Sequence, residues 1–143
     1  MQTYGFHFVG YVGGKKDPIY RTYTFKDSET LTKGDMLNLE SGEVDLFATG
    51  GDTGLIGIAD ETKTGVDSTT TIRVIWDANG QAIYRVTDAN ARTEGTLLDI
   101  TGTTGAQTVG ADGDTDLIVV ANSAADEPTY VRSVIRSRGE PTS

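Results

Sequence analysis

The chain contains a single histidine, His7, and no cysteine, so few side chains are available as catalytic nucleophiles or bases. A Ser–His–Asp triad would have to use the imidazole of His7, but no serine of the sequence lies in a nucleophile motif such as G-x-S-x-G. His7 is instead surrounded by alternating aromatic residues. We therefore interpret it as a solvated or interface residue and not as a general base.

Three aspartates, Asp112, Asp114 and Asp116, have the alternating spacing with which a calcium-binding loop begins. An EF-hand loop also needs glycine at its sixth position and glutamate at its twelfth, and these positions are Leu117 and Ser123 here. The pattern therefore favours a solvated turn, with weak Ca²⁺ binding as the alternative. Most other acidic residues lie in turn-like contexts, so they do not single out a carboxylate pair for glycoside hydrolysis.

Charge and glycine content exclude further classes of function. The glycines at 50–51 and 102–105 lack the strand-to-helix context and the lysine of a phosphate-binding loop. The net charge of −9 disfavours nucleic-acid binding, because an acidic surface repels phosphates. No apolar run approaches the roughly 20 residues that span a bilayer, and the first residues do not resemble a signal peptide. We expect no enzyme activity, no cofactor, no nucleic-acid partner and no membrane partner, and synthesis in a host cytoplasm.

The elements that must position any site are strands. The length of 143 residues fits one domain, and short apolar runs between turns rich in Gly, Thr, Asp and Asn indicate an all-β fold. Residues 36–39 and 44–48 predict a hairpin with its turn at 40–43. Residues 70–76 and 82–86 predict a second hairpin, joined by Asn79-Gly80, which places Trp76 in the core with Ile72 and Val74. Residues 101–116 are expected to form a long loop.

The aromatic residues concentrate near the N-terminus, where seven of the ten Phe and Tyr residues precede Lys26. They alternate in two segments, 4–12 and 19–25, which the turn residues at 13–18 separate. One interpretation is a hairpin that packs its aromatics in its own core. The other is an arm that places its aromatics on a neighbouring subunit, since aromatics are enriched in interface cores. The predicted interface residues are Tyr4, Phe6, Phe8, Tyr11, Tyr20, Tyr23 and Phe25.

A resemblance to a viral family covers roughly residues 31–136. Its motifs are Lys33-Gly34-Asp35 before a short hairpin, Gly57-Ile58-Ala59, and the strands at 71–74 and 83–86. This arrangement resembles the head decoration, or cement, proteins of tailed viruses, whose fold is like that of the lambda decoration protein. The resemblance implies a small β-barrel or β-tulip, here at 26–136. Outside it, the residue pattern predicts an extended aromatic-rich N-terminal arm or hairpin at 1–25 and a flexible tail at 137–143.

The same resemblance implies a function without catalysis. Members of the family sit as trimers on the outer capsid surface and bridge major capsid subunits. A hydrophobic content of 36% is low for a chain with many strands, and this also favours a homotrimer. We therefore predict a capsid decoration protein located on the virion, with the major capsid protein as its partner. The alternative is a trimeric tail-associated or receptor-binding β module, whose exposed aromatics would lie on loops.

Overall fold

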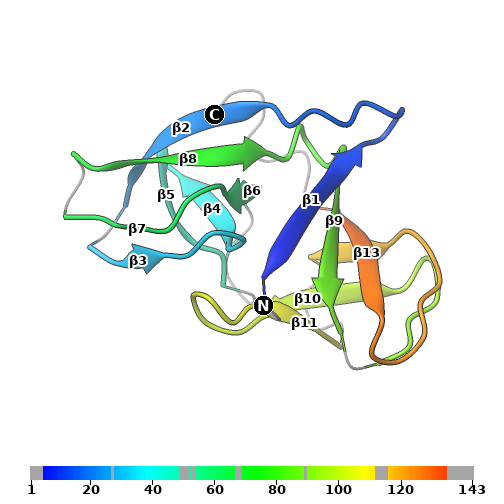
Figure 1. Cartoon of the computed structure of the whole chain (residues 1–143). Helices are drawn as coiled ribbons and strands as arrows, with labels where there is room; N and C mark the ends of the chain where they lie inside the picture. The colour runs from blue at the N-terminus through cyan, green and yellow to red at the C-terminus, as the bar shows by residue number, and fades with distance from the viewer. Residues whose placement is uncertain are drawn as a thin grey trace.

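The backbone alternates between short strands and tight turns, as the sequence predicts. The computed structural model describes residues 5–26, 28–48, 52, 54–66, 69–88, 90–111 and 116–134. These residues contain thirteen strands and no helix, which confirms the all-β fold class. Two larger sheets lie side by side, a closed barrel and a six-stranded open sheet (Figure 1).

The barrel is closed by five strands, so each of its strands has a neighbour on both sides. In the order of their pairing the strands are β2 (Tyr20–Phe25), β5 (Glu43–Leu46), β4 (Met36–Glu40), β6 (Leu55–Ala59) and β8 (Thr71–Trp76). The short β2–β5 ladder is parallel, and the other ladders of the barrel are antiparallel. The expected β4–β5 hairpin is confirmed, with Ser41 and Gly42 at positive φ in its turn.

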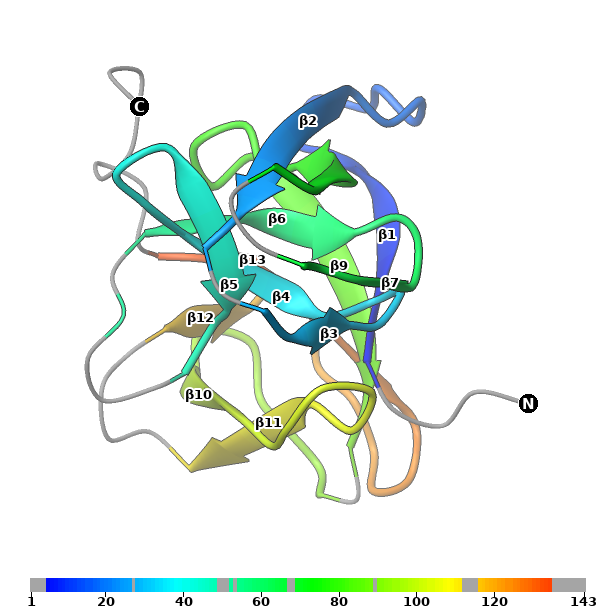
Figure 2. The ribbon, with the colours of Figure 1, turned by 90° about the vertical axis from the view of Figure 1, so that its left-hand side faces the viewer.

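The open sheet consists of strands from both ends of the described chain. Their order is β1 (Phe6–Tyr11), β9 (Ala82–Thr87), β13 (Pro128–Ser133), β12 (Leu117–Val119), β10 (Leu97–Thr101) and β11 (Thr108–Ala111). A two-stranded ladder of β3 (Thr30–Leu31) and β7 (Lys63–Thr64) completes the fold. Figure 2 shows β10 and β11 below the barrel strands.

Two apolar cores follow from this arrangement. Aliphatic side chains and Phe25 fill the barrel interior, where Leu37, Val44 and Ile72 are fully buried. The second core lies between the open sheet and the outer face of the barrel. The barrel contributes Met36, Phe47, Leu55, Ile58 and Ile75 to this second core. The barrel therefore serves as the second layer that the open sheet needs.

Gly57 shifts the alternation of β6 between the two cores. Its φ is +147°, and the β4–β6 register shifts beside it, as in a β-bulge. The bulge breaks the alternation, so that Ile56 faces the barrel interior and Ile58 faces the open sheet. A Cβ on Gly57 would lie 2.0 Å from the carbonyl oxygen of Ile75. Close approach of β8 thus requires glycine at this position.

Buried polar side chains fasten the barrel to the open sheet. The carboxylate of Asp35, before β4, accepts bonds from the amides of Thr32 and Gly105, at 2.8 and 2.9 Å. Gln107, which is fully buried, accepts a bond from the Met36 amide and donates one to the Phe47 carbonyl. Because these groups are buried and hydrogen-bonded, the two sheets have a fixed relative position.

The predicted Asn79-Gly80 hairpin is wrong. A tight turn is present, with Ala78, Asn79 and Gly80 at positive φ. However, β8 pairs with β2 and β6, whereas β9 pairs with β1 and β13. The turn therefore passes the chain from the barrel to the open sheet instead of folding it back on itself. Trp76, expected in the core, is half-buried at this crossing.

The described part of the predicted N-terminal arm or hairpin at 1–25 contributes one strand to each of the two larger sheets. β1 pairs with β9 of the open sheet, and β2 pairs with β5 and β8 of the barrel. The two strands do not pair with each other; they enter different sheets because Phe6 and Phe25 belong to different cores. The expected loop at 101–116 contains β11, and the expected tail at 137–143 lies outside the described residues.

Candidate functional site

The structure separates the seven predicted interface aromatics. Three of them, Phe6, Tyr11 and Phe25, are at most 7% exposed and complete the chain's own cores. Their burial leaves little of these three side chains for contact with a partner. Tyr20 is 52% exposed, and Phe8 and Tyr23 are half-buried. For all of them the interface assignment stays a prediction. Tyr4 lies outside the described residues.

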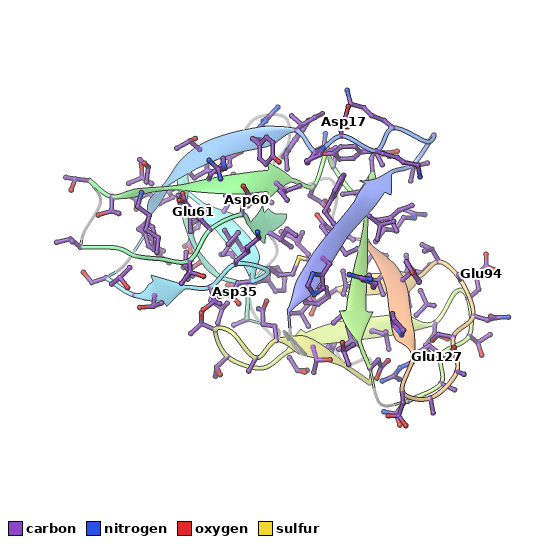
Figure 3. The ribbon with its side chains drawn as sticks, in the orientation of Figure 1. Asp17, Asp35, Asp60, Glu61, Glu94 and Glu127 are labelled. Carbon is purple, nitrogen blue, oxygen red and sulfur yellow. The ribbon has the colours of Figure 1, made fainter. Side chains whose placement is uncertain are left out.

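The sequence-derived candidates for chemistry do not assemble into a centre. Asp116 is buried and accepts a bond from the Ile100 amide at 2.9 Å, while Asp112 and Asp114 lie outside the described residues. In the part of the chain that the structure describes, no three His, Asp or Glu side chains are grouped to hold a metal. The acidic residues labelled in Figure 3 are spread from the barrel to the far loops of the open sheet. The described residues also contain no helix long and apolar enough to cross a membrane.

Four residues near the end of the barrel where β2 begins and β8 ends form what we call the Arg–aromatic rim: Tyr20, Arg21, Arg73 and Trp76. The guanidinium carbon of Arg21 lies 3.6 Å from the centroid of the Trp76 ring, and that of Arg73 lies 5.5 Å from the Tyr20 ring. By strand alternation the two pairs occupy opposite faces of the β2–β8 ladder. The rim is therefore a partly exposed set of stacked cations and aromatics.

A second feature is a hollow of about 500 Å³ between β1 and the barrel, which we call the β1 groove. Its floor contains Phe6, Ile58 and Ile75, all of which are buried. Its rim carries the half-buried Phe8 and, on the barrel side, Asp60. This size falls within the roughly 300–1,000 Å³ of typical ligand pockets.

The basic side chains of the groove come from three separate elements. His7 of β1 lies directly opposite Arg85 of β9, and Lys33 comes from the turn between β3 and β4. Burial lowers the pKa of His7, and the positive charges of Arg85 and Lys33 lower it further. Asp60, the acidic residue of the lining, forms an ion pair with Arg73 at 2.7 Å. The sequence analysis missed this groove because its residues are far apart in the chain.

Comparisons with known proteins identify no family for the chain. No family model matches it, and no curated protein matches it. Among solved structures it is similar to the head fiber gp8.5 N base of bacteriophage phi29, with 14% identity, a TM-score of 0.49, and coverage of 82% of this chain and 97% of that one. A likeness at this level carries no argument about function.

Proposed function

We propose that this chain is a non-catalytic structural protein that binds the outer surface of a tailed-virus head and stabilises contacts between major capsid subunits. The observation that carries the proposal is the Arg–aromatic rim. Tyr, Trp and Arg are the residue types that dominate binding energy at protein interfaces. Here the rings and guanidinium groups are already stacked on two strands of a closed barrel, so they lose little conformational entropy on binding.

The fold also suits attachment to a lattice. Two fastened sheets present their surfaces in a fixed geometry, and many identical copies on a shell make modest interfaces collectively strong. The sequence resemblance at 31–136 supports the major capsid protein as partner and a homotrimer as the bound form. On this proposal Tyr20 and Tyr23 remain contact candidates, and the location is the outer surface of the virion.

The test uses shells of the virus that encodes this chain, prepared without the protein. We expect purified protein to co-sediment with these shells and to raise their melting temperature. Tyr20→Ala and Arg73→Gln should each lower shell affinity at least tenfold, a factor that corresponds to about 1.4 kcal/mol. Tyr130→Ala is the matched control, because Tyr130 is a half-buried tyrosine on the open sheet.

Two results would contradict the proposal. One is shell binding that is indifferent to Tyr20 and Arg73, and the other is binding to isolated tails but not to heads. Native mass spectrometry of the bound protein tests the oligomeric state, and a monomer on the shell would exclude the trimer.

A further inference from the structure

We infer that the β1 groove binds a short, extended, acidic segment of a partner protein. The segment would pair with the open edge of β1 and place a carboxylate among His7, Lys33 and Arg85. This inference rests on the proposed function in one respect, that the partner is a protein of the shell. It concerns a different surface from the Arg–aromatic rim. The two surfaces meet at the ion pair of Arg73 and Asp60, so Tyr20→Ala is the variant that tests the rim alone, and the two proposals can fail separately.

β1 is an edge strand of the open sheet. Within the described residues β1 pairs only with β9. The amide of Phe6 donates to the carbonyl of Gly34 at 2.8 Å, on the side away from β9. Since these directions alternate along an antiparallel strand, the amide and carbonyl of Phe8 point to that same side. One residue of an added strand could form both hydrogen bonds with Phe8.

The chain itself limits the length of the occupant. At one end the Gly34 carbonyl already occupies the Phe6 amide, and at the other the Lys15 carbonyl accepts a bond from the Tyr11 amide at 2.7 Å. Only the stretch around Phe8 stays open between them. An extended segment of a few residues fits this opening, whereas a helix would satisfy its own backbone groups and leave those of Phe8 unpaired.

Basic side chains gather at the β1 groove. The chain has a net charge of −9, yet three of its basic side chains, His7, Lys33 and Arg85, line one groove. Within the described part of the chain neither Lys33 nor Arg85 forms an ion pair, and Asp60 is already paired with Arg73. A carboxylate placed there would be attracted by at least two positive charges. A nucleic-acid strand would meet the same charges but would be repelled by the acidic surface around them.

Part of the groove lining is apolar. Successive side chains of a strand point to opposite sides, so a segment that presents an acidic residue to the basic rim presents its neighbours elsewhere. Phe8 is half-buried beside the groove and stacks edge-on against Tyr11, with ring centroids 4.9 Å apart. An aliphatic residue next to the acidic one can therefore pack on Phe8. The expected occupant alternates acidic and aliphatic residues.

The experiment uses three fluorescent eight-residue peptides with the purified protein. One alternates valine with glutamate, one alternates valine with lysine, and the third is the glutamate peptide N-methylated at alternate residues, which blocks strand pairing. The protein variants are Lys33→Ala and Arg85→Ala. Lys15→Ala is the matched control, because this exposed lysine lies in the turn after β1. Fluorescence anisotropy gives affinity, and amide chemical shifts locate the peptide.

We expect the glutamate peptide to bind at least tenfold more tightly than the lysine peptide and to shift the amide of Phe8. N-methylation should weaken binding at least tenfold, and Lys33→Ala and Arg85→Ala at least threefold each, while Lys15→Ala changes nothing. Equal binding of both charged peptides, or full binding by the Lys33 and Arg85 variants, would overturn the inference. Shell co-sedimentation of the wild-type protein separates the two proposals. If the protein binds shells but shows no preference among the peptides, only the groove inference is refuted. If it binds the glutamate peptide but not the shells, only the proposed function is refuted.

Discussion

The barrel and the open sheet solve the problem of unpaired strand edges differently. In the barrel every strand is paired on both sides, and the interior is lined by hydrocarbon side chains such as Leu37 and Ile72. The open sheet keeps two edge strands, β1 and β11, and depends on the outer face of the barrel to cover its core. Closure removes backbone groups that a partner could pair with, and an open edge retains them.

Buried polar groups follow the same division. Asp35, Asp77 and Gln107 lie where the barrel meets the open sheet or where the chain crosses between them. The barrel therefore acts as the rigid base, while the junction and the β1 edge carry the groups that respond to solvent or to a partner.

Replacement of Gly57 by alanine should prevent barrel closure. The new Cβ would lie 2.0 Å from the Ile75 carbonyl oxygen, and φ is +147°, which disfavours any residue with a side chain. We expect a loss of more than about 4 kcal/mol or no folded protein. Urea denaturation measures the loss.

Gly42→Ala is the control for backbone strain alone. Gly42 also has positive φ, at +83°, but nothing lies within 4 Å of a Cβ placed there. This variant should lose only about 1 kcal/mol. Similar losses of stability in Gly57→Ala and Gly42→Ala would show that the close contact between β8 and Gly57 is not required for closing the barrel.

The sequence predicted local pairing better than it predicted which sheet a strand joins. The β4–β5 hairpin could be predicted, because its turn residues and its apolar alternation agree. Asn79-Gly80 gave an equally strong turn signal, yet the strands on either side diverge into different sheets. A turn motif fixes only the local backbone direction; the partner of each strand depends on burial of distant residues such as Tyr84 and Ile75.

For a similar reason, the aromatic excess leaves both a core hairpin and an interface arm open. Alternation showed that Phe6 and Phe25 lie on apolar faces, but not that each face meets a core within the same chain. The groove was beyond the sequence altogether, since His7, Lys33 and Arg85 come together only through the pairing of β1 with β9 and the turn before β4. Neither the aromatic alternation nor the sequence positions of the three groove residues show which distant strands pack together in the fold.

Alanine substitutions of Phe25 and Phe6 compare the two cores directly. Both side chains are at most 1% exposed, and both come from the predicted arm. We expect Phe25→Ala to cost about 4–5 kcal/mol, because hydrogen-bonded strands surround its cavity. Phe6→Ala should cost about 3 kcal/mol, since an edge strand can move to fill part of the space. Equilibrium unfolding provides both values. An unchanged stability of Phe6→Ala would support the predicted N-terminal arm in place of a core strand.

The junction should add a pH dependence through Asp77. Burial raises the pKa of Asp77 to about 6 from an ordinary 3.8, although hydrogen bonds from the Tyr84 hydroxyl, at 2.6 Å, and the Gly80 amide lower it. Between these two values the folded state binds the proton more tightly than the unfolded state. This contribution is therefore fully present below about pH 4 and is lost as pH rises through 6, by about 3 kcal/mol.

Asp77→Asn isolates this effect from the other carboxylates. The stability of the wild type relative to the variant should fall by about 3 kcal/mol between pH 4 and 7. Urea unfolding at a series of pH values measures the difference. A difference that is constant with pH would mean that Asp77 stays ionised in the folded protein.

The smallest effect belongs to the Arg–aromatic rim, where the barrel surface meets solvent. Trp76 packs against the barrel core on one side and lies under the Arg21 guanidinium, 3.6 Å away, on the other. A partly exposed cation–π pair contributes about 0.5–1 kcal/mol, so a double-mutant cycle of Arg21→Gln and Trp76→Leu should give a coupling in that range. The Arg73–Tyr20 pair, at 5.5 Å, should give a smaller coupling.

If the stacking serves to preorganise a binding surface, disrupting it should change shell affinity more than it changes stability. Equal changes in both quantities would show that Arg21 only supports the barrel.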